Sequence, residues 1–426
     1  MFNQLEADFP THRPRTEGAE LALQGIRIVD FTHFIAGPFA TMILADMGAE
    51  VIKVESPGKG DDFRQYPPMV PEFGGGVPYA WTNRNKRSIA LDLKSSEGLA
   101  LARELVAKAD IVVENFSTGV IERLGLGYET FRESNPGLIF CSVSAYGRKG
   151  AFADRLGFDP IAQAESGFIS MNGYPDREGV RALSPVMDIS TAMMTSNAIL
   201  GALVARARTG KGQAVEVALF DTAVLMTGYA PLQELYTGKG PVRPGNTSPD
   251  TCPSGVFKSM DQSFLINCGN TQIFQRLMTQ VLDLPQVASD PAYATNKDRV
   301  AKRQTLFSLL QDEFSRQPWE YWQARMRAAN VPCGELRTVG EAIRSPEAHE
   351  QQIVTRIPHP ELGWVPNIAL PIRYAQTPLA DPAPAPRVGE HTLDVLGEWL
   401  GYNRERLETL AEAGAFGAAA VQGALK

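Results

Sequence analysis

One stretch near the N-terminus, DFTHFIAGPFATMILADMGAEVIKVE (Asp30–Glu55), constrains the fold most strongly. Its apolar runs predict one strand over Gly25–Phe31 and a second strand over Glu50–Glu55. Between them, Pro38 suits the first turn of a helix, where a missing N–H costs nothing, and Gly48 suits the left-handed position just after a helix end. The stretch therefore predicts a strand–turn–helix–strand unit, in which the amides at the start of the helix face an anionic ligand.

The turn of this unit does not have the pattern of a dinucleotide-binding protein. Its residues FTHFIAGP lack the G-x-G-x-x-G fingerprint, and no acidic residue stands where a ribose would be bound. A nicotinamide-dependent oxidoreductase would share the α/β pattern but needs those glycines. We therefore expect this unit to bind a different phosphate-bearing ligand.

The alternation of strands and helices continues beyond this unit. Further β-rich apolar runs lie at Ile111–Val113 and Leu138–Val143, and a helix with one apolar face is predicted over Ser96–Ala109. A long helical stretch over Ile189–Thr209 precedes another predicted strand at Ala214–Leu219. This order predicts a mostly parallel sheet covered by helices, which is an α/β fold.

Length and composition divide the chain into regions. Its 426 residues are too many for one average domain. The stretch GKGPVRPGNTSPDTCP is rich in glycine and proline, as linkers are. We expect the first part of a large domain at 1–225, a linker at 226–253, a small α+β domain at 254–335, and a linker with the return to the large domain at 336–426.

Charge and cysteine content disfavour several classes of protein. A net charge of -7 argues against nucleic acids and anionic membranes as partners, because both bind basic surfaces. No apolar run approaches the ~18 residues of a membrane span, and residues 1–24 contain no signal-peptide core. The four cysteines and five histidines lack the spacing of metal ligands. We expect reduced thiols, no metal and a cytoplasmic location.

Four blocks of the chain together resemble the class III CoA-transferase family. They are the N-terminal stretch above, NRNKRSIALDLK (Asn83–Lys94), ADIVVENFSTGVIERLGLGY (Ala109–Tyr128) and RTGKGQAVEVALFDTAV (Arg208–Val224). Relatives in this family include formyl-CoA transferases, carnitine CoA-transferases and α-methylacyl-CoA racemases. The resemblance implies a large Rossmann-like domain built from both chain ends, a small domain between them, and an interlocked homodimer.

The resemblance implies an enzyme that moves CoA from an acyl-CoA donor to a carboxylic acid, with a dicarboxylic acid as the favoured acceptor class. Asp188, in SPVMDIST, aligns with the nucleophilic aspartate of the family. That residue forms an aspartyl anhydride and then an aspartyl-CoA thioester. The position of Asp188 before a predicted helix, taken alone, favours a helix N-cap, and the two roles are compatible. CoA is expected as a substrate, and no permanently bound cofactor is predicted.

The resemblance also implies a set of residues around CoA. Asn115 and Phe116 lie at a predicted strand end, where α/β sheets bind ligands. Ser56 stands where some members have an arginine, so the phosphate contacts are expected to differ. For any single cation of the set, a solvated surface charge is the simpler interpretation. The implied set is Ile35, Ala36, Leu91, Asp92, Leu93, Lys94, Asn115, Phe116, Arg123 and Arg155, with Lys86 and Arg87 as additions.

Position 158 separates two activities within the resemblance. The racemase branch has a histidine here that acts as a second base, whereas this chain has Phe158, in GFDPIAQ. A transferase is therefore favoured, and a 2-methylacyl-CoA racemase is an alternative. A non-catalytic acyl-CoA-binding protein is another alternative, although it would not need Asp188. Asp159 is a candidate for a polar network near the site. Oxalate is disfavoured as the acceptor, because oxalate-using members have a glutamine in place of Ile35 and a glycine-rich loop in the small domain.

Overall fold

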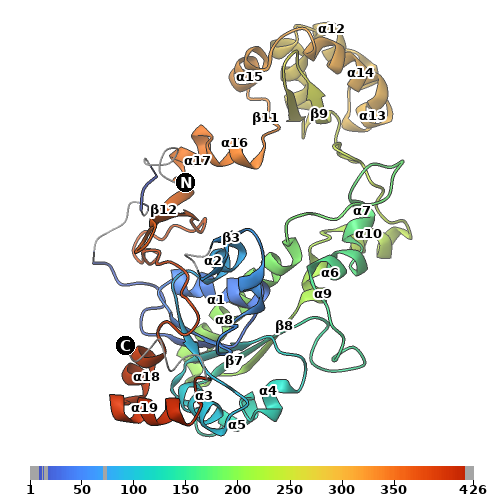
Figure 1. Ribbon diagram of the computed structural model, residues 1–426. Coiled ribbons are helices and arrows are strands. Elements are labelled where there is room, and N and C mark those ends of the chain that lie inside the picture. Colours follow the sequence, from blue (N-terminus) through green and yellow to red (C-terminus); the bar gives the residue numbers. More distant parts are fainter. Residues whose placement is uncertain (1–8, 12, 14–17, 71–73, 418–426) are drawn as a thin grey trace. The chain divides into compact units, whose positions relative to one another are not determined.

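The computed structural model describes residues 9–11, 13, 18–70 and 74–417 (Figure 1). The chain forms two compact units, which we describe separately. The first unit comprises Met1–Ser166, Ala182–Gly228 and Pro346–Lys426, and the second comprises Gly167–Arg181 and Tyr229–Ser345. The domain boundaries expected from composition remain predictions.

The first unit contains a six-stranded sheet with the strand order β5-β2-β1-β6-β7-β8, in which every neighbouring pair is parallel. The predicted α/β class with a mostly parallel sheet is therefore confirmed. The strands are β1 (Arg27–Asp30), β2 (Glu50–Glu55), β5 (Lys86–Ala90), β6 (Ile111–Glu114), β7 (Ile139–Ser144) and β8 (Ala214–Ala218). The chain adds strands on one side of β1 and then on the other, so the direction of winding switches between β1 and β6. Open α/β sheets bind ligands at the carboxyl ends of the strands beside such a switch.

Helices cover both faces of this sheet (Figure 1). Alternate residues of each strand point to opposite faces, so Ile28 packs with α1 (Ala36–Asp46) and α8 (Val186–Thr209), while Val29 packs with the other helices. The helices on the second face are α3 (Ser96–Lys108), α18 (Thr392–Leu400) and α19 (Arg404–Glu412). The C-terminal segment thus completes the core of the N-terminal sheet.

The helix boundaries follow local sequence signals closely. Ser95 accepts a hydrogen bond from the N–H of Gly98 and caps α3, which begins at Ser96 as expected. The helix expected to open at Pro38 begins two residues earlier, at Ala36. The remaining elements of the first unit are η1 (Asp62–Gln65), β3 (Met69–Val70), β4 (Gly75–Gly76), α2 (Val77–Asn83), α4 (Val120–Arg123), α5 (Tyr128–Phe131), α6 (Asp159–Glu165), α9 (Leu219–Leu225), α17 (Pro346–Glu350), β12 (Val354–His359) and β13 (Gly363–Ile368).

The second unit contains a three-stranded antiparallel sheet with the order β11-β10-β9. Its core is strongly aromatic, since Phe264 stacks on Trp319 with ring centroids 4.7 Å apart and meets Phe314 edge-on at 5.0 Å. Its elements are α7 (Phe168–Met171), α10 (Ala230–Thr237), β9 (Ser254–Lys258), β10 (Ser263–Asn267), α11 (Thr271–Arg276), η3 (Leu277–Val281), α12 (Pro285–Ala288), η4 (Pro291–Tyr293), α13 (Asn296–Ala301), α14 (Arg303–Phe314), α15 (Trp319–Ala328), β11 (Cys333–Glu335) and α16 (Val339–Ile343). Within the described residues of both units, no helix combines the length and apolar character needed to cross a membrane.

Candidate active site

The turn between β1 and α1 is held by a buried carboxylate, Asp30. Its Oδ1 accepts hydrogen bonds from the N–H and the hydroxyl of Thr32, at 2.8 and 2.5 Å. Its Oδ2 accepts from the hydroxyl of Thr41 at 2.6 Å and from Lys86 Nζ at 3.0 Å. Burial alone would raise the pKa of Asp30. The charges of Lys86 and Lys53 nevertheless hold this pKa well below its usual range. Asp30 therefore fixes the turn as a permanent anion.

This arrangement corrects the expectation that Lys86 contacts CoA, whereas the same expectation for Arg87 stays a prediction. Lys86 is buried, and its Nζ also donates to the carbonyl of Pro38 and to Asn83 Oδ1, both at 2.8 Å. Arg87 pairs with Glu398 and Glu50. Both cations are engaged by the fold itself, because a lysine in a buried strand needs an anionic partner there.

A second buried pair shapes the next residues of the turn. Lys53 Nζ lies 3.0 Å from Asp61 Oδ2 and donates to the carbonyl of Thr32 at 2.7 Å. Asp61 Oδ1 accepts from the N–H groups of Phe34 and Phe63, at 3.2 and 3.0 Å. Phe34 has a φ of 65°, which is uncommon for a residue other than glycine. The anchored N–H of Phe34 therefore helps to hold this backbone conformation.

The end of β6 is joined to the same turn. Asn115 Oδ1 accepts from the N–H of His33, and Asn115 Nδ2 donates to the carbonyl of His33, both at 2.9 Å. The ring of Phe116 lies 5.7 Å from the ring of His33. Burial, and then the charge of Lys53, lowers the pKa of His33, so its imidazole is neutral at physiological pH.

A pocket of about 380 Å³ opens at the carboxyl ends of β1, β6 and β7, where the winding of the sheet switches. Its size falls in the range of small-molecule sites. The predicted site residues that line it are Ile35, Ala36, Asn115, Phe116, Arg155 and Asp188. The structure thus brings together residues that lie far apart in the chain.

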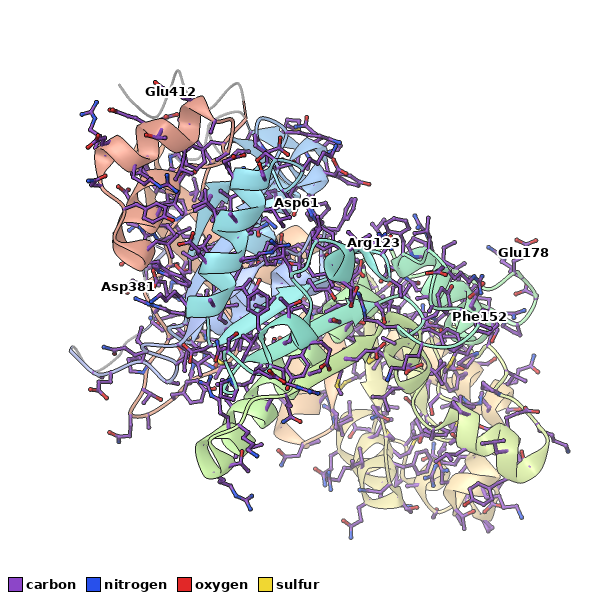
Figure 2. The ribbon with its side chains drawn as sticks, turned by 90° about the horizontal axis from the view of Figure 1, so that it is seen from below. Asp61, Arg123, Phe152, Glu178, Asp381 and Glu412 are labelled. Atoms are coloured by element: carbon purple, nitrogen blue, oxygen red, sulfur yellow. The ribbon has the colours of Figure 1, made fainter. Side chains whose placement is uncertain are left out.

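The other predicted residues lie outside this lining. Leu91 to Lys94 follow β5, the outermost strand on one side, where Leu91 is buried and Asp92 Oδ1 accepts from the N–H of Lys94 at 3.0 Å. Arg123 is exposed on α4 (Figure 2). Ser56 is exposed, and its hydroxyl donates to the carbonyl of Gly60 at 3.2 Å. These residues stay predictions for the distal part of a CoA molecule.

Arg155 is a cation of the pocket wall with an anionic neighbour. It pairs with Glu165, and its guanidinium lies 4.6 Å from the ring centre of Tyr146. Because its side chain is 45% exposed, a phosphate can compete with Glu165 for it.

Asp188 lies in the first turn of α8 and lines the pocket. The N-cap residue of this helix is Pro185, so the interpretation of Asp188 as the N-cap is wrong. Asp159 Oδ2 instead accepts from the N–H groups of Met187 and Asp188, at 2.7 and 3.2 Å. Burial, and then the charge of Asp159, raises the pKa of Asp188 to about 7. Within the described part of the chain, no group donates a hydrogen bond to its carboxylate.

Phe158 also lines this pocket, with 55% of the residue exposed. Its ring meets Phe34 edge-on, with centroids 5.9 Å apart. This part of the pocket wall is therefore a ring that cannot take a proton. The residues described here also contain no group of three or more histidine, cysteine, aspartate or glutamate side chains that could hold a metal ion.

Sequence reasoning missed the buried support of the site. Lys53–Asp61 and Asp30–Lys86 were not identified, and neither was Glu114, which accepts from the N–H of Phe116 at 2.9 Å. A signal was present, because charged residues interrupt the otherwise apolar strands VIKVE and IVVE. Such residues in a buried strand must find partners.

The fold and this pocket define an α/β protein that presents a free carboxylate at the ligand-binding edge of a parallel sheet. The chain belongs to CoA-transferase family III, whose model matches residues 23–392. The family inferred from the sequence is thereby confirmed. The protein is an enzyme of this family and uses CoA thioesters, so the nicotinamide-dependent and non-catalytic alternatives are set aside.

Relatives that are named as CoA-transferases align with most of the chain. It is 36% identical over 396 residues to the succinate–glutarate CoA-transferase of Agrobacterium fabrum (strain C58 / ATCC 33970), covering 92% of this chain and 97% of the relative. It is 38% identical over 336 residues to the acetyl-CoA:oxalate CoA-transferase of Acetobacter aceti, covering 78% and 85%. A crystal structure of a CAIB/BAIF family protein from Brucella suis is similar with a TM-score of 0.80 and 35% identity, covering 89% of this chain and 100% of that one.

Proposed function

We propose that this enzyme transfers CoA from a donor acyl-CoA to a dicarboxylic acid, with Asp188 as the covalent nucleophile. One observation carries the proposal. The carboxylate of Asp188 accepts no hydrogen bond from the described residues, has a raised pKa, and shares its pocket with Ile35, Ala36, Asn115 and Phe116. A carboxylate without donors is more basic than one held by amides, and so it is a better nucleophile toward a thioester.

The reaction proceeds through exchanges at activated acyl groups. An Asp188 carboxylate oxygen attacks the thioester carbon of the donor, and the C–S bond breaks to give a mixed anhydride and CoA thiolate. The thiolate attacks the aspartyl carbonyl, which releases the donor acid and leaves an aspartyl-CoA thioester. The acceptor carboxylate then attacks this thioester and displaces the thiolate. Finally the thiolate attacks the acceptor carbonyl, which frees Asp188 and the new acyl-CoA.

The pocket divides the binding of CoA between apolar and charged groups. The turn residues Ile35 and Ala36 and the ring of Phe116 give an apolar wall for the pantetheine arm. Arg155 supplies a positive charge at the pocket, and Arg123 and Lys94 supply exposed charges for the phosphates. Phosphates bound by such exposed cations make the affinity for CoA sensitive to salt.

Two features support a dicarboxylic acceptor. The relatives described above are named for succinate, glutarate and oxalate, each of which has two carboxylates. The pocket that the proposed nucleophile lines is also lined by a partly exposed arginine, Arg155. A panel assay decides the acceptor: succinyl-, acetyl- and formyl-CoA are each mixed with mono- and dicarboxylic acids, oxalate included, and the new acyl-CoA is identified by mass spectrometry. Transfer to monocarboxylic acids alone would contradict the proposed class.

Asp188→Asn tests the nucleophile directly. The amide keeps the size of the side chain but cannot form the anhydride, so transfer should fall by several orders of magnitude. Intact mass after incubation with acyl-CoA should show an adduct on the wild type and none on the variant. If the variant keeps more than about a tenth of the wild-type rate, Asp188 is not the nucleophile.

We also propose the interlocked homodimer that the family resemblance implies. Interlocked chains separate only if part of the fold opens, so the dimer should persist on dilution. Sedimentation of a monomer at low micromolar concentration would contradict this assembly.

A further inference from the structure

The start of α8 is capped by a residue from another helix. The first amides of a helix have no partner within it. Here the N–H of Met187 donates to Asp159 Oδ2 at 2.7 Å, and the N–H of Asp188 donates to the same oxygen at 3.2 Å. Asp159 is the first residue of α6 and is buried. The helix that carries the proposed nucleophile therefore begins on a carboxylate that lies 29 residues away in sequence.

Asp159 is itself held in place by Gln163. The side-chain amide of Gln163, one turn later on α6, donates to Asp159 Oδ1 at 2.5 Å. The same side chain accepts from the N–H of Ala182 at 2.8 Å, so it also joins α6 to the segment that leads into α8. Gln163 is fully buried. Both oxygens of Asp159 are thus engaged, one by Gln163 and the other by α8.

This arrangement reverses the usual environment of an acidic residue in a first helical turn. Such a carboxylate normally accepts hydrogen bonds from the free amides and is favoured by the helix dipole, which together lower its pKa. Asp188 has the opposite shift, since burial and the charge of Asp159 raise its pKa to about 7. The first amides of α8 donate to Asp159 instead, so no hydrogen bond from them offsets the effect of burial on Asp188.

Other charged groups surround Asp188. Burial raises the pKa of Asp188, and the charge of Asp159 raises it further. The pocket wall carries His33, Asp62, Asp154 and Arg155. The elements packed against α8 carry Asp46, Glu165, Glu216 and Asp221. Among these, Asp46 is bound to Arg84, and Glu165 is bound to Arg155.

We propose that Asp159 is a positioning residue for CoA transfer: it takes the first amides of α8 and leaves the Asp188 carboxylate without donors, as a free nucleophile at the pocket. Asp159 acts through the backbone of α8 and through its charge, and it forms no bond to substrate. The inference rests on the proposed role of Asp188. It adds an explanation of why the Asp188 carboxylate, at the start of α8, accepts no hydrogen bond from the amides of that helix.

The pH dependence of kcat/KM for transfer tests this role, because its acid limb reports the ionisation of the free enzyme. Asp159→Asn keeps an oxygen that can accept from Met187 but removes the charge. We expect the acid limb of the kcat/KM profile of Asp159→Asn to lie about one pH unit below that of wild type. Its plateau kcat should fall while the KM for acyl-CoA changes by less than about threefold. Asp159→Ser, which keeps a smaller acceptor without the charge, should shift the limb in the same direction.

The matched control is Asp221→Asn on α9, which packs against α8 but leaves its cap intact. Asp221 is exposed, so this variant should keep the wild-type limb and rate. Of Asp159→Asn and Asp159→Ser, the variant that unfolds as cooperatively as wild type is used for the comparison. A wild-type acid limb in that variant would overturn the inference, even if its rate were reduced. Failure of Asp188 as nucleophile is a separate result, seen if Asp188→Asn keeps more than about a tenth of the wild-type rate.

Discussion

Replacing Asp188 by asparagine should stabilise the folded protein at alkaline pH, although it removes the proposed nucleophile. Burial and the charge of Asp159 raise the pKa of Asp188 from 3.8 to about 7 in the folded state. An unfolded chain ionises this group near its ordinary pKa. The folded state therefore holds a proton that the unfolded state releases, and ionisation of Asp188 weakens the fold.

The size and sign of the effect follow from this shift. Well below pH 3.8 both states are protonated, and Asp188 has no effect on stability. As the pH rises from about 4 to 7, ionisation of Asp188 lowers the free energy of unfolding, and above pH 7 this loss is constant. A shift of about three pKa units corresponds to about 4 kcal/mol at pH 8, and to about 1 kcal/mol at pH 4.5. Asparagine is neutral, so Asp188→Asn should recover these amounts; because Asp188 is partly exposed, solvent screening makes them upper values.

Urea denaturation of wild type and Asp188→Asn at pH 4.5 and pH 8 measures this difference. The midpoint of the variant should exceed that of wild type at pH 8 by clearly more than at pH 4.5. Asp221→Asn serves as the control, because an exposed carboxylate should change stability by less than about 0.5 kcal/mol at either pH. An equal gain at both pH values, or a loss at pH 8, would refute the reasoning.

Two further substitutions test the support and the binding part of the site. Lys86→Met should lower the free energy of unfolding by about 3–5 kcal/mol, because it removes the cation that lies at Asp30 Oδ2. Urea denaturation measures this loss, with Lys108→Met at an exposed position as the control. Equal losses in the two variants would show that the buried pair is not responsible. Arg155→Ala should raise the KM for acyl-CoA about tenfold with kcat nearly unchanged, and an unchanged KM would remove Arg155 from the CoA site.

Much of the fold could be predicted because buried parallel strands are continuous apolar runs. The strand expected over Glu50–Glu55 is β2, and the helix expected over Ser96–Ala109 ends one residue earlier, at Lys108. Asn115 and Phe116 could also be placed, because the carboxyl ends of parallel strands meet at one edge of a sheet. These inferences need only local pattern and a general rule of topology.

The partners of the buried charges could not be predicted in the same way. Lys53 lies in a strand whose neighbours are apolar, and this position alone shows that it needs an anion. It does not show which one, because Asp61, Asp30 and Glu55 all contribute to the field at Lys53. That choice depends on how the segment after β2 folds back over the turn, which is a tertiary property.

Asp188 shows where a local rule fails for a physical reason. Sequence alone favours it as a helix cap, because an acidic side chain before a helix normally takes the first amides. In the folded protein the first amides of α8 donate to Asp159 Oδ2, while Asp159 Oδ1 accepts from Gln163. Asp188 is then left with a raised pKa and no hydrogen-bond donor among the described residues. A conflict between local preference and tertiary structure is expected at functional sites, and here the residue that the helix leaves unpaired is the proposed nucleophile.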